Sequence, residues 1–152
     1  EYFAAAGALL LGRRTYEDFS RVWPARTDNR FTPWLTNTQK YVASTSLVEP
    51  LAWANSTVLH GDAGDAVAKL RSEPGKDILV LGSGALVRSL MPRSLVDVYV
   101  LLIHPVVLGS GERLFAEGVA RSTLRLVGAR TTSAGVVMAT YEPTAGKDSS
   151  GS

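Results

Sequence analysis

Residues 8–19 read ALLLGRRTYEDF, and this stretch decides the first half of the fold. Its continuous apolar start is typical of a strand that is buried on both faces of a sheet. Thr15 followed by Asp18 resembles a capping box, so we expect the next helix to open at Thr15. Arg13 and Arg14 fall at the corner between the strand and the helix. Two adjacent arginines at such a corner are either solvated turn residues or ligands for an anion.

A second corner of the same design lies in residues 77–90, which read DILVLGSGALVRSL. At each corner the first amides of the helix lack intrahelical partners and carry the positive end of the helix dipole, so an anion can bind there. Gly82 and Gly84 would let a phosphate approach the backbone closely. The alternative is that both glycines only permit a tight turn, since Val87 stands where the dinucleotide-binding fingerprint has a third glycine.

Both corners are expected at the carboxyl ends of parallel strands, where nucleotides usually bind. Two anion sites favour a ligand with two anionic regions, such as a dinucleotide that carries an extra ribose phosphate. Arg13 and Arg14 add fork-shaped donors that suit phosphate oxygens. Glu17 and Asp18, in the turn that follows, would partly repel the same anion. These residues alone leave the role of the arginine pair open.

The rest of the chain alternates strand and helix patterns. We expect a helix stop at Gly7, a short helix that opens at Thr32 and Pro33, and a helix over 63–73 that is capped by Asp62. The expected strands are residues 40–45, 56–61 and 77–82, a long strand over 95–109 that turns at His104-Pro105, and a hairpin over 122–143.

Strands that alternate with helices predict an α/β fold with a mainly parallel central sheet flanked by helices. The closing hairpin predicts an antiparallel edge on that sheet. We expect one domain over residues 1–143 and a flexible, small and polar tail over 144–152.

Composition limits the classes of function. The chain has 152 residues, of which 45% are hydrophobic and 20% charged, which is enough for one domain with a core. Its 16 basic and 14 acidic residues give a net charge of +2, so nucleic acid is not expected as a partner. The lack of cysteine excludes disulfides and thiolate catalysis.

No apolar run approaches the roughly 20 residues that span a bilayer, and the start lacks a signal-peptide pattern. We expect a soluble, cytoplasmic protein without a membrane partner.

Other catalytic motifs are absent from the sequence. It contains neither a P-loop nor a nucleophile elbow. His60 and His104 lie far apart without a cluster of further ligands, so we expect no metal site. Trp23 and Trp34 stand at helical positions, which favours packing in the core over lining a pocket. No acid, base or nucleophile can be assigned, and the catalytic residues stay unknown.

Four stretches in order, LLLGRRTYEDF, KYVASTSL, DILVLGSGALVRSL and LVDVYVLLIHPVVLGSGERLF, resemble the bacterial branch of the dihydrofolate reductase-like fold. That branch includes the reductase domain of the bifunctional riboflavin biosynthesis deaminase-reductase, and the resemblance runs from Leu9 to Pro143. It implies an NADPH-dependent reductase that transfers hydride to a pterin-like or ribosylaminopyrimidine-like substrate, as a 5-amino-6-(5-phosphoribosylamino)uracil reductase does. It also implies a homodimer.

The resemblance assigns a cofactor site. It places the arginine pair at the ribose phosphate that distinguishes NADPH from NADH, and the segment Gly109–Phe115 on the substrate side. The cofactor-binding residues that it implies are Gly12, Arg13, Arg14, Thr15, Ser44, Thr45, Gly82, Ser83, Gly84, Ala85 and Leu86.

The chain departs from the family pattern at its front. Family members begin with a strand and a mobile loop, whereas here nothing before Glu1 supplies them. We therefore expect an additional strand from a preceding segment or from a neighbouring chain, because the inner strands would otherwise keep unpaired backbone groups. Since no catalytic group can be named, a non-catalytic module that binds a nucleotide or forms a dimer on the same fold is the alternative function.

Overall fold

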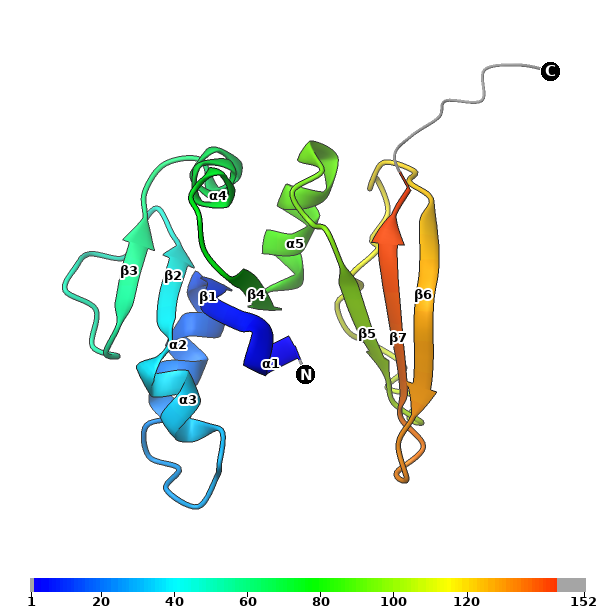
Figure 1. Ribbon diagram of the computed structural model, residues 1–152, viewed down its shortest axis with the longest axis horizontal. Helices are drawn as coiled ribbons and strands as arrows, with labels where there is room; N and C mark the ends of the chain where they lie inside the picture. The colour runs from blue at the N-terminus through cyan, green and yellow to red at the C-terminus, as the bar shows by residue number, and fades with distance from the viewer. Residues whose placement is uncertain (1, 145–152) are drawn as a thin grey trace. The chain divides into compact units, whose positions relative to one another are not determined.

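The computed structural model describes residues 2–144. Its contacts divide the chain into two compact units, Glu1–Arg93 and Ser94–Ser152 (Figure 1). The single domain over 1–143 therefore stays a prediction. The predicted tail falls outside the described residues except for Thr144, whose backbone N–H and hydroxyl both donate to the carbonyl of Thr123. Within residues 2–144, none of the helices is both long and apolar enough to cross a membrane.

The first unit is built on a parallel sheet of four strands in the order β3-β2-β1-β4. Because the strands are parallel, their carboxyl ends meet along one edge of the sheet. In chain order the elements are α1 (Tyr2–Ala5), β1 (Ala6–Gly12), α2 (Arg13–Val22), α3 (Thr32–Asn37), β2 (Gln39–Ala43), β3 (Ser56–Leu59), α4 (Ala63–Ser72), β4 (Asp77–Gly82), α5 (Gly84–Leu90) and a 3₁₀ helix (Met91–Arg93).

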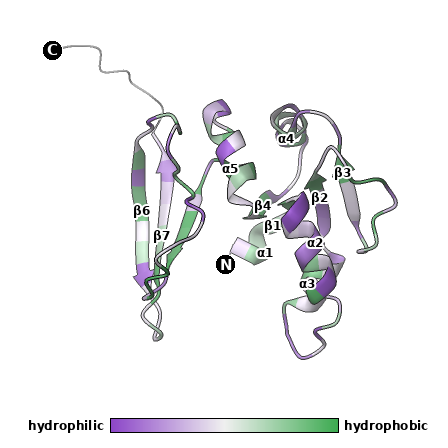
Figure 2. Ribbon diagram, turned by 180° about the vertical axis from the view of Figure 1, so that it is seen from behind, coloured by the Kyte–Doolittle hydropathy of each residue, from purple (hydrophilic) through white to green (hydrophobic). Residues whose placement is uncertain are grey.

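Strand β1 is the centre of this sheet, as its continuous apolar sequence predicts. Leu9, Leu10 and Leu11 are almost completely buried, and β1 pairs with β2 on one side and β4 on the other. Strand β4 is hydrophobic in sequence (Figure 2) but only half-buried, because among the described strands it pairs with β1 alone. The prediction of an additional strand stays a prediction.

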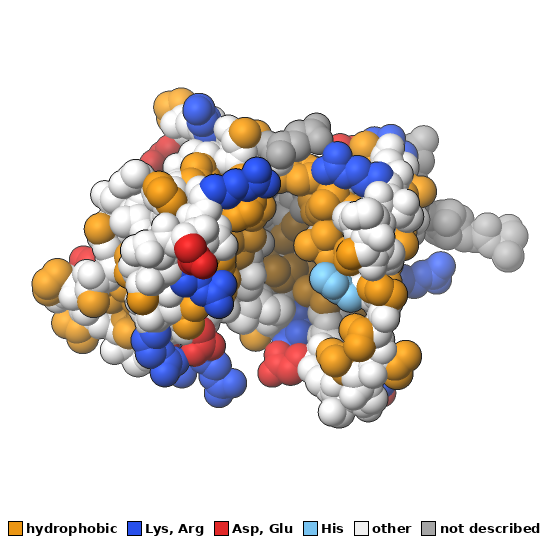
Figure 3. Space-filling model, turned by 90° about the horizontal axis from the view of Figure 1, so that it is seen from below, with side chains coloured by type: hydrophobic (Ala, Val, Ile, Leu, Met, Phe, Trp, Pro, Cys, Tyr) orange, Lys and Arg blue, Asp and Glu red, His pale blue; other side chains and the backbone are white. Residues whose placement is uncertain are grey.

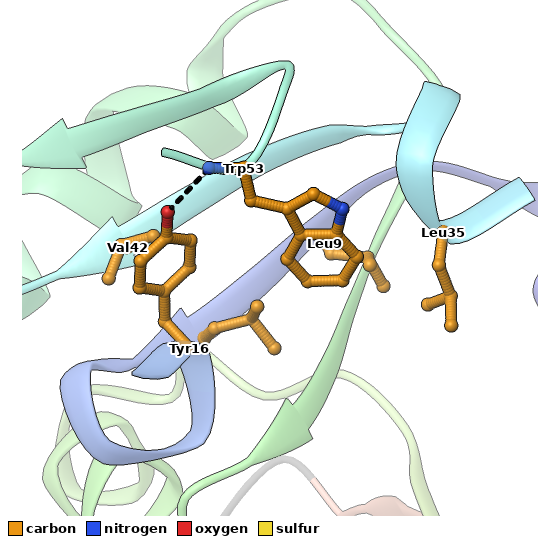
Figure 4. Close-up of a cluster of buried hydrophobic side chains, with 6 residues drawn as sticks. Leu9, Tyr16, Leu35, Val42 and Trp53 are labelled. Carbon is orange, nitrogen blue, oxygen red and sulfur yellow. Dashed lines mark hydrogen bonds between the residues drawn. The ribbon is translucent and has the colours of Figure 1, made fainter. Parts of the chain in front are cut away.

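The core of the first unit joins β1 and β2 to α2, α3 and the loop before β3. Its buried members are Leu9, Leu11, Tyr16, Leu35, Val42 and Trp53. Figure 4 shows the ring of Tyr16 turned towards Trp53, whose backbone N–H donates to the Tyr16 hydroxyl oxygen at 3.1 Å. That bond satisfies a loop amide inside the core and ties α2 to the loop before β3.

The second unit is an antiparallel sheet in the order β5-β7-β6, with β5 at Tyr99–Ile103, β6 at Leu124–Thr131 and β7 at Val137–Pro143. The predicted hairpin is confirmed: β6 and β7 join through a turn in which Gly135 has a φ of +80°. The hairpin does not form an edge of the parallel sheet in the described part of the chain. There, β7 pairs with β5 on one side and β6 on the other, in a sheet of their own.

Two boundaries differ from the sequence-based expectation. Helix α2 begins at Arg13, because Gly12 has extended backbone (φ −74°, ψ 161°) and takes the N-cap position that was predicted for Thr15. Strand β5 ends at Ile103, well short of the predicted strand over 95–109. Pro105 offers no backbone donor and restricts the residue before it, which stops the ladder there.

Gly7 lies within β1 and does not end a helix, since α1 already stops at Ala5. The register of β1 against β4 shifts between Ala6 and Ala8. A Cβ at Gly7 would lie 2.8 Å from the Cβ of Lys76, which is closer than side chains tolerate. Gly7 therefore permits a bulge and a close approach between two strands.

Lys40 is the buried charge of the described structure, with 0% exposure. Its Nζ donates to three carbonyl oxygens at the end of α3, those of Leu35 (2.7 Å), Thr36 (3.2 Å) and Thr38 (2.8 Å). Nζ also lies 4.5 Å from the ring centroid of Trp53. Burial lowers the pKa of Lys40 to about 8. The ammonium group supplies the donors that the last carbonyls of a helix otherwise lack.

We expect Lys40→Met to lower the free energy of unfolding at neutral pH by about 1–3 kcal/mol, because the buried carbonyls lose their donor. The folded pKa lies below the unfolded value of 10.5, so the unfolded chain binds more protons between about pH 8 and pH 10.5. The wild type therefore gains stability relative to K40M as pH rises through this window, and loses it as pH falls. Urea unfolding across the window measures the difference.

The matched control for this prediction is Lys69→Met, because Lys69 lies exposed on α4. K69M should follow the wild-type curve at each pH. A difference between wild type and K40M that stays constant across the window would contradict the prediction.

Candidate functional site

A cavity of about 600 Å³ lies at the carboxyl edge of the parallel sheet. Its wall combines the ends of β1 and β2, the first residues of α4 and α5, and the loops between them. This is where a parallel α/β sheet is expected to bind a ligand. Six residues of the cofactor prediction line the wall: Gly12, Arg13, Ser44, Thr45, Ser83 and Leu86.

The two strand-to-helix corners pack directly against each other. A Cβ at Gly12 would lie 3.0 Å from the hydroxyl oxygen of Ser83, and a Cβ at Gly82 would lie 2.9 Å from that of Thr15. Gly82 has a φ of +149°, which favours glycine, and the Gly82–Ser83 peptide bond is cis. Gly82 and Thr15 are therefore packing partners in the described structure, and neither lines the cavity.

Three helices begin at the cavity, and only two of them begin with a side-chain cap. Asp62 accepts from the backbone N–H of Asp65 at the start of α4, and Ser83 accepts from that of Leu86 at the start of α5. Helix α2 begins after Gly12 with no side-chain cap. Its first-turn amides therefore keep unused donors beside the cavity wall, which makes α2 the helix end best suited to an anion.

The two residues of the predicted arginine pair lie in different surroundings. Arg13 lines the cavity and donates from Nη1 to the carboxylate of Glu17, one turn later on α2, at 3.0 and 3.2 Å. Arg14 is exposed and does not line the wall. Gly84 and Ala85 also lie off the wall, so at the second corner only Ser83 and Leu86 reach the cavity.

The loop after β2 has a defined local structure. The hydroxyl oxygen of Ser44 accepts from the backbone N–H groups of Ser46 and Leu47, at 3.1 and 3.0 Å. This turn leaves the side chains of Thr45 and Ser46 exposed at the cavity. The loop therefore offers two hydroxyl groups to a ligand.

Sequence reasoning missed the part of the wall that follows β3, together with the last residue of β2 and one residue of the loop after it. The missed residues are Ala43, Ser46, Gly61, Asp62 and Ala63. The predicted cap role of Asp62 is confirmed, but its place on the wall was not foreseen. The signal was available: a parallel strand that ends just before a helix cap meets the same sheet edge as the two glycine corners.

Asp62 is fixed by an arginine from the end of the first unit. Arg93 donates to the carboxylates of Asp62 at 2.8 Å and Asp65 at 2.6 Å, and these contacts raise the pKa of Arg93. A Cβ at Gly64 would overlap the Arg93 guanidinium, so this glycine makes room for it. The carboxylates at the start of α4 are thereby paired with an arginine of the 3₁₀ helix.

On the face drawn in Figure 3, lysine and arginine side chains lie in separate groups with acidic side chains among them. The described side chains on that face do not form a continuous basic surface. At the cavity itself, the α2 amides and Arg13 are the local groups that can attract an anionic ligand. The wall supplies hydrogen-bond donors, hydroxyl groups and a guanidinium, which are binding groups.

The segment Gly109–Phe115 belongs to the second unit, and its place on the substrate side stays a prediction.

Known proteins resemble this chain in sequence and in fold. YyaP of Bacillus subtilis (strain 168), an uncharacterized protein, is 33% identical over 140 residues, which cover 88% of this chain and 72% of YyaP. A putative riboflavin biosynthesis protein from Shewanella sp. PV-4 has a TM-score of 0.73 at 20% identity, over 93% of this chain and 76% of that one. Dihydrofolate reductase from Enterococcus faecalis, solved with NADP(H) and RAB-propyl, has a TM-score of 0.62 at 18% identity, over 90% and 74%.

These similarities confirm the predicted dihydrofolate reductase-like α/β fold, a fold shared with reductases. Residues 1–138 match the RibD C-terminal domain family. That match spans most of the chain, from its start to the first residues of β7, and it agrees with the resemblance seen in the sequence. The chain belongs to the RibD C-terminal domain family.

Proposed function

We propose that the protein is an NADPH-dependent reductase. The observation that carries the proposal is the cavity at the carboxyl edge of the sheet, where the uncapped start of α2 lies next to the guanidinium of Arg13. Free helix amides and a guanidinium are the groups that proteins use to bind phosphates. The cavity volume of about 600 Å³ falls among those of small-molecule sites, which span about 300–1,000 Å³.

The wall residues fit a dinucleotide in chemical type. The α2 amides and Arg13 would hold phosphate, and the exposed hydroxyls of Thr45 and Ser46 would bind a polar part of the adenosine. Leu86 adds an apolar contact at the second corner. The cofactor, when bound, supplies a hydride, and the protein supplies binding and orientation. The substrate that we propose is pterin-like or ribosylaminopyrimidine-like, and the support for it is the family.

The first test is a calorimetric titration of the chain with NADPH, together with oxidation of NADPH in the presence of candidate pterins and ribosylaminopyrimidines. We expect saturable binding and substrate-dependent loss of the NADPH absorbance. Binding without turnover of any substrate would favour the alternative, a non-catalytic nucleotide-binding module. Absence of NADPH binding up to millimolar concentration would contradict the proposed cofactor.

A second test separates the two arginines. We expect Arg13→Ala to weaken NADPH binding by about 1.5–3 kcal/mol and NADH binding by much less, because a charge-assisted contact to the extra phosphate is lost. Arg14→Ala should have the smaller effect, since Arg14 lies off the cavity wall. Titrations with both cofactors measure the difference.

Arg21→Ala is the control, because Arg21 lies exposed on the same helix and pairs with Asp18. It should leave the affinity for both cofactors near the wild-type value. Equal losses of NADPH and NADH affinity in R13A would mean that Arg13 only shapes the corner.

We also propose that the chain forms a homodimer. The supporting feature is a group of exposed apolar side chains at the end of β5 and in the loop after it, formed by Leu102, Ile103, Val106, Val107 and Leu108. Exposed apolar side chains that follow closely in the chain favour contact with another protein surface.

Val107 is 94% exposed in the single chain, and the proposed dimer contact would bury it. A buried unpaired carboxylate is costly, so Val107→Asp should shift the mass measured by light scattering from dimer to monomer. Val48→Asp is the control: Val48 is also exposed but lies in the other unit, and the dimer should persist. A wild-type mass equal to the monomer over a wide concentration range would rule the dimer out.

A further inference from the structure

The arginine on the cavity wall already has an anionic partner. Both carboxylate oxygens of Glu17 accept from the same nitrogen, Nη1 of Arg13, at 3.0 and 3.2 Å. Within residues 2–144, Nε and Nη2 of Arg13 donate to no other group. The guanidinium can therefore bind an incoming phosphate through its remaining donors while Glu17 stays attached.

The carboxylate on the cavity wall also has a partner of opposite charge. Asp62, the carboxylate on the wall, is paired with Arg93 at 2.8 Å. Each charged side chain of the wall therefore has its own counter-charge. A ligand phosphate meets Arg13 with a carboxylate in contact with the same guanidinium, and that carboxylate repels the phosphate.

We infer that Glu17 is a specificity-determining residue, which lowers the preference of the site for a dinucleotide with an extra ribose phosphate. The inference rests on the proposed function. Glu17 has two opposing effects: it orients the guanidinium, and it places a negative charge beside the phosphate. The pair is about two-fifths exposed on each side, and such surface pairs orient their partners only weakly. The repulsion acts on a phosphate that carries close to two charges, so it outweighs the orientation.

Glu17→Gln removes the charge and keeps the shape and an acceptor for Arg13. We expect E17Q to bind NADPH about 3–10-fold more tightly than the wild type, with a change below about 2-fold for NADH. The selectivity for NADPH over NADH should therefore rise. The gain should shrink at high salt, because the pair is partly exposed and its field is screened.

Asp18→Asn provides a matched control. Asp18 is the next residue on α2, carries the same charge and pairs with an arginine at 2.6 Å, but that arginine is Arg21, which does not line the cavity. A general change in the net charge of α2 would act in D18N and E17Q alike. Only E17Q removes the negative charge that contacts the arginine of the cavity wall.

The experiment is a calorimetric titration of the full chain with NADPH and with NADH, at low and at high salt, for wild type, E17Q and D18N. A second variant, Glu17→Ala, guards against a folding defect in E17Q, and thermal unfolding checks each protein.

A selective gain for NADPH in E17Q or E17A but not in D18N supports the inference. Equal effects of E17Q and D18N overturn it, as does weaker NADPH binding in E17Q, which would make Glu17 an orienting residue. Wild-type protein that binds neither cofactor overturns the proposed function, whereas wild-type binding without the selective gain overturns this inference alone.

Discussion

The close approach of the two strand-to-helix corners is the constraint on which the candidate site depends. Gly12 lies against Ser83 and Gly82 lies against Thr15, so close that a Cβ would lie 3.0 Å from the Ser83 hydroxyl oxygen or 2.9 Å from the Thr15 hydroxyl oxygen. This contact brings the end of β1 next to the end of β4, so that α2 and α5 start beside each other. Since β2 pairs with the other side of β1, the loop after β2 completes the wall. A side chain at either glycine would therefore require Ser83 or Thr15 to shift, which alters the packing of the two corners.

In the first unit, side chains satisfy the backbone groups at some helix ends and leave those at the start of α2 without a side-chain partner. Lys40 satisfies carbonyls at the end of α3, Asp62 caps the start of α4, and Ser83 caps the start of α5. The start of α2 has no side-chain cap and lies at the cavity. Buried or partly buried backbone donors are costly when they remain unpaired, so an uncapped helix start at a cavity favours an anionic ligand. The position that we propose for binding thus follows from the backbone groups that the protein's own side chains leave without a partner.

The chain belongs to the RibD C-terminal domain family and shares its fold with reductases. A shared fold indicates the place where a ligand is expected to bind, but it does not identify the ligand. At 20% identity or less to the solved structures, the path of the backbone is retained while most side chains differ. Selectivity depends on such side chains, and in our proposal it depends on the ion pair between Arg13 and Glu17. The balance of charge around one guanidinium is therefore a property of this chain and not of the fold.

Several features were determined by the sequence alone, because their causes are local. The apolar run before Gly12 predicted a buried strand, Asp62 predicted a helix cap, and residues 122–143 predicted a hairpin, and all three are confirmed. Each depends on periodicity or on a cap within one or two turns of the chain. Of the wall residues, the pattern of a strand, a glycine and a helix pointed to Gly12 and Arg13, whereas Ser44, Thr45, Ser83 and Leu86 were expected from the family resemblance.

The rest was decided by tertiary structure, because it depends on residues that are distant in sequence. Thr15 reads as a helix cap, yet Gly12 takes that position and Thr15 packs on Gly82. Lys40 reads as a polar residue at the start of a strand, yet the end of α3 and the ring of Trp53 enclose it. Arg13 and Arg14 are equivalent in the sequence, and only the direction in which α2 leaves the sheet puts one on the wall and the other in solvent. Periodicity cannot predict these outcomes, because the sheet order and the packing of the corners determine which side chains meet.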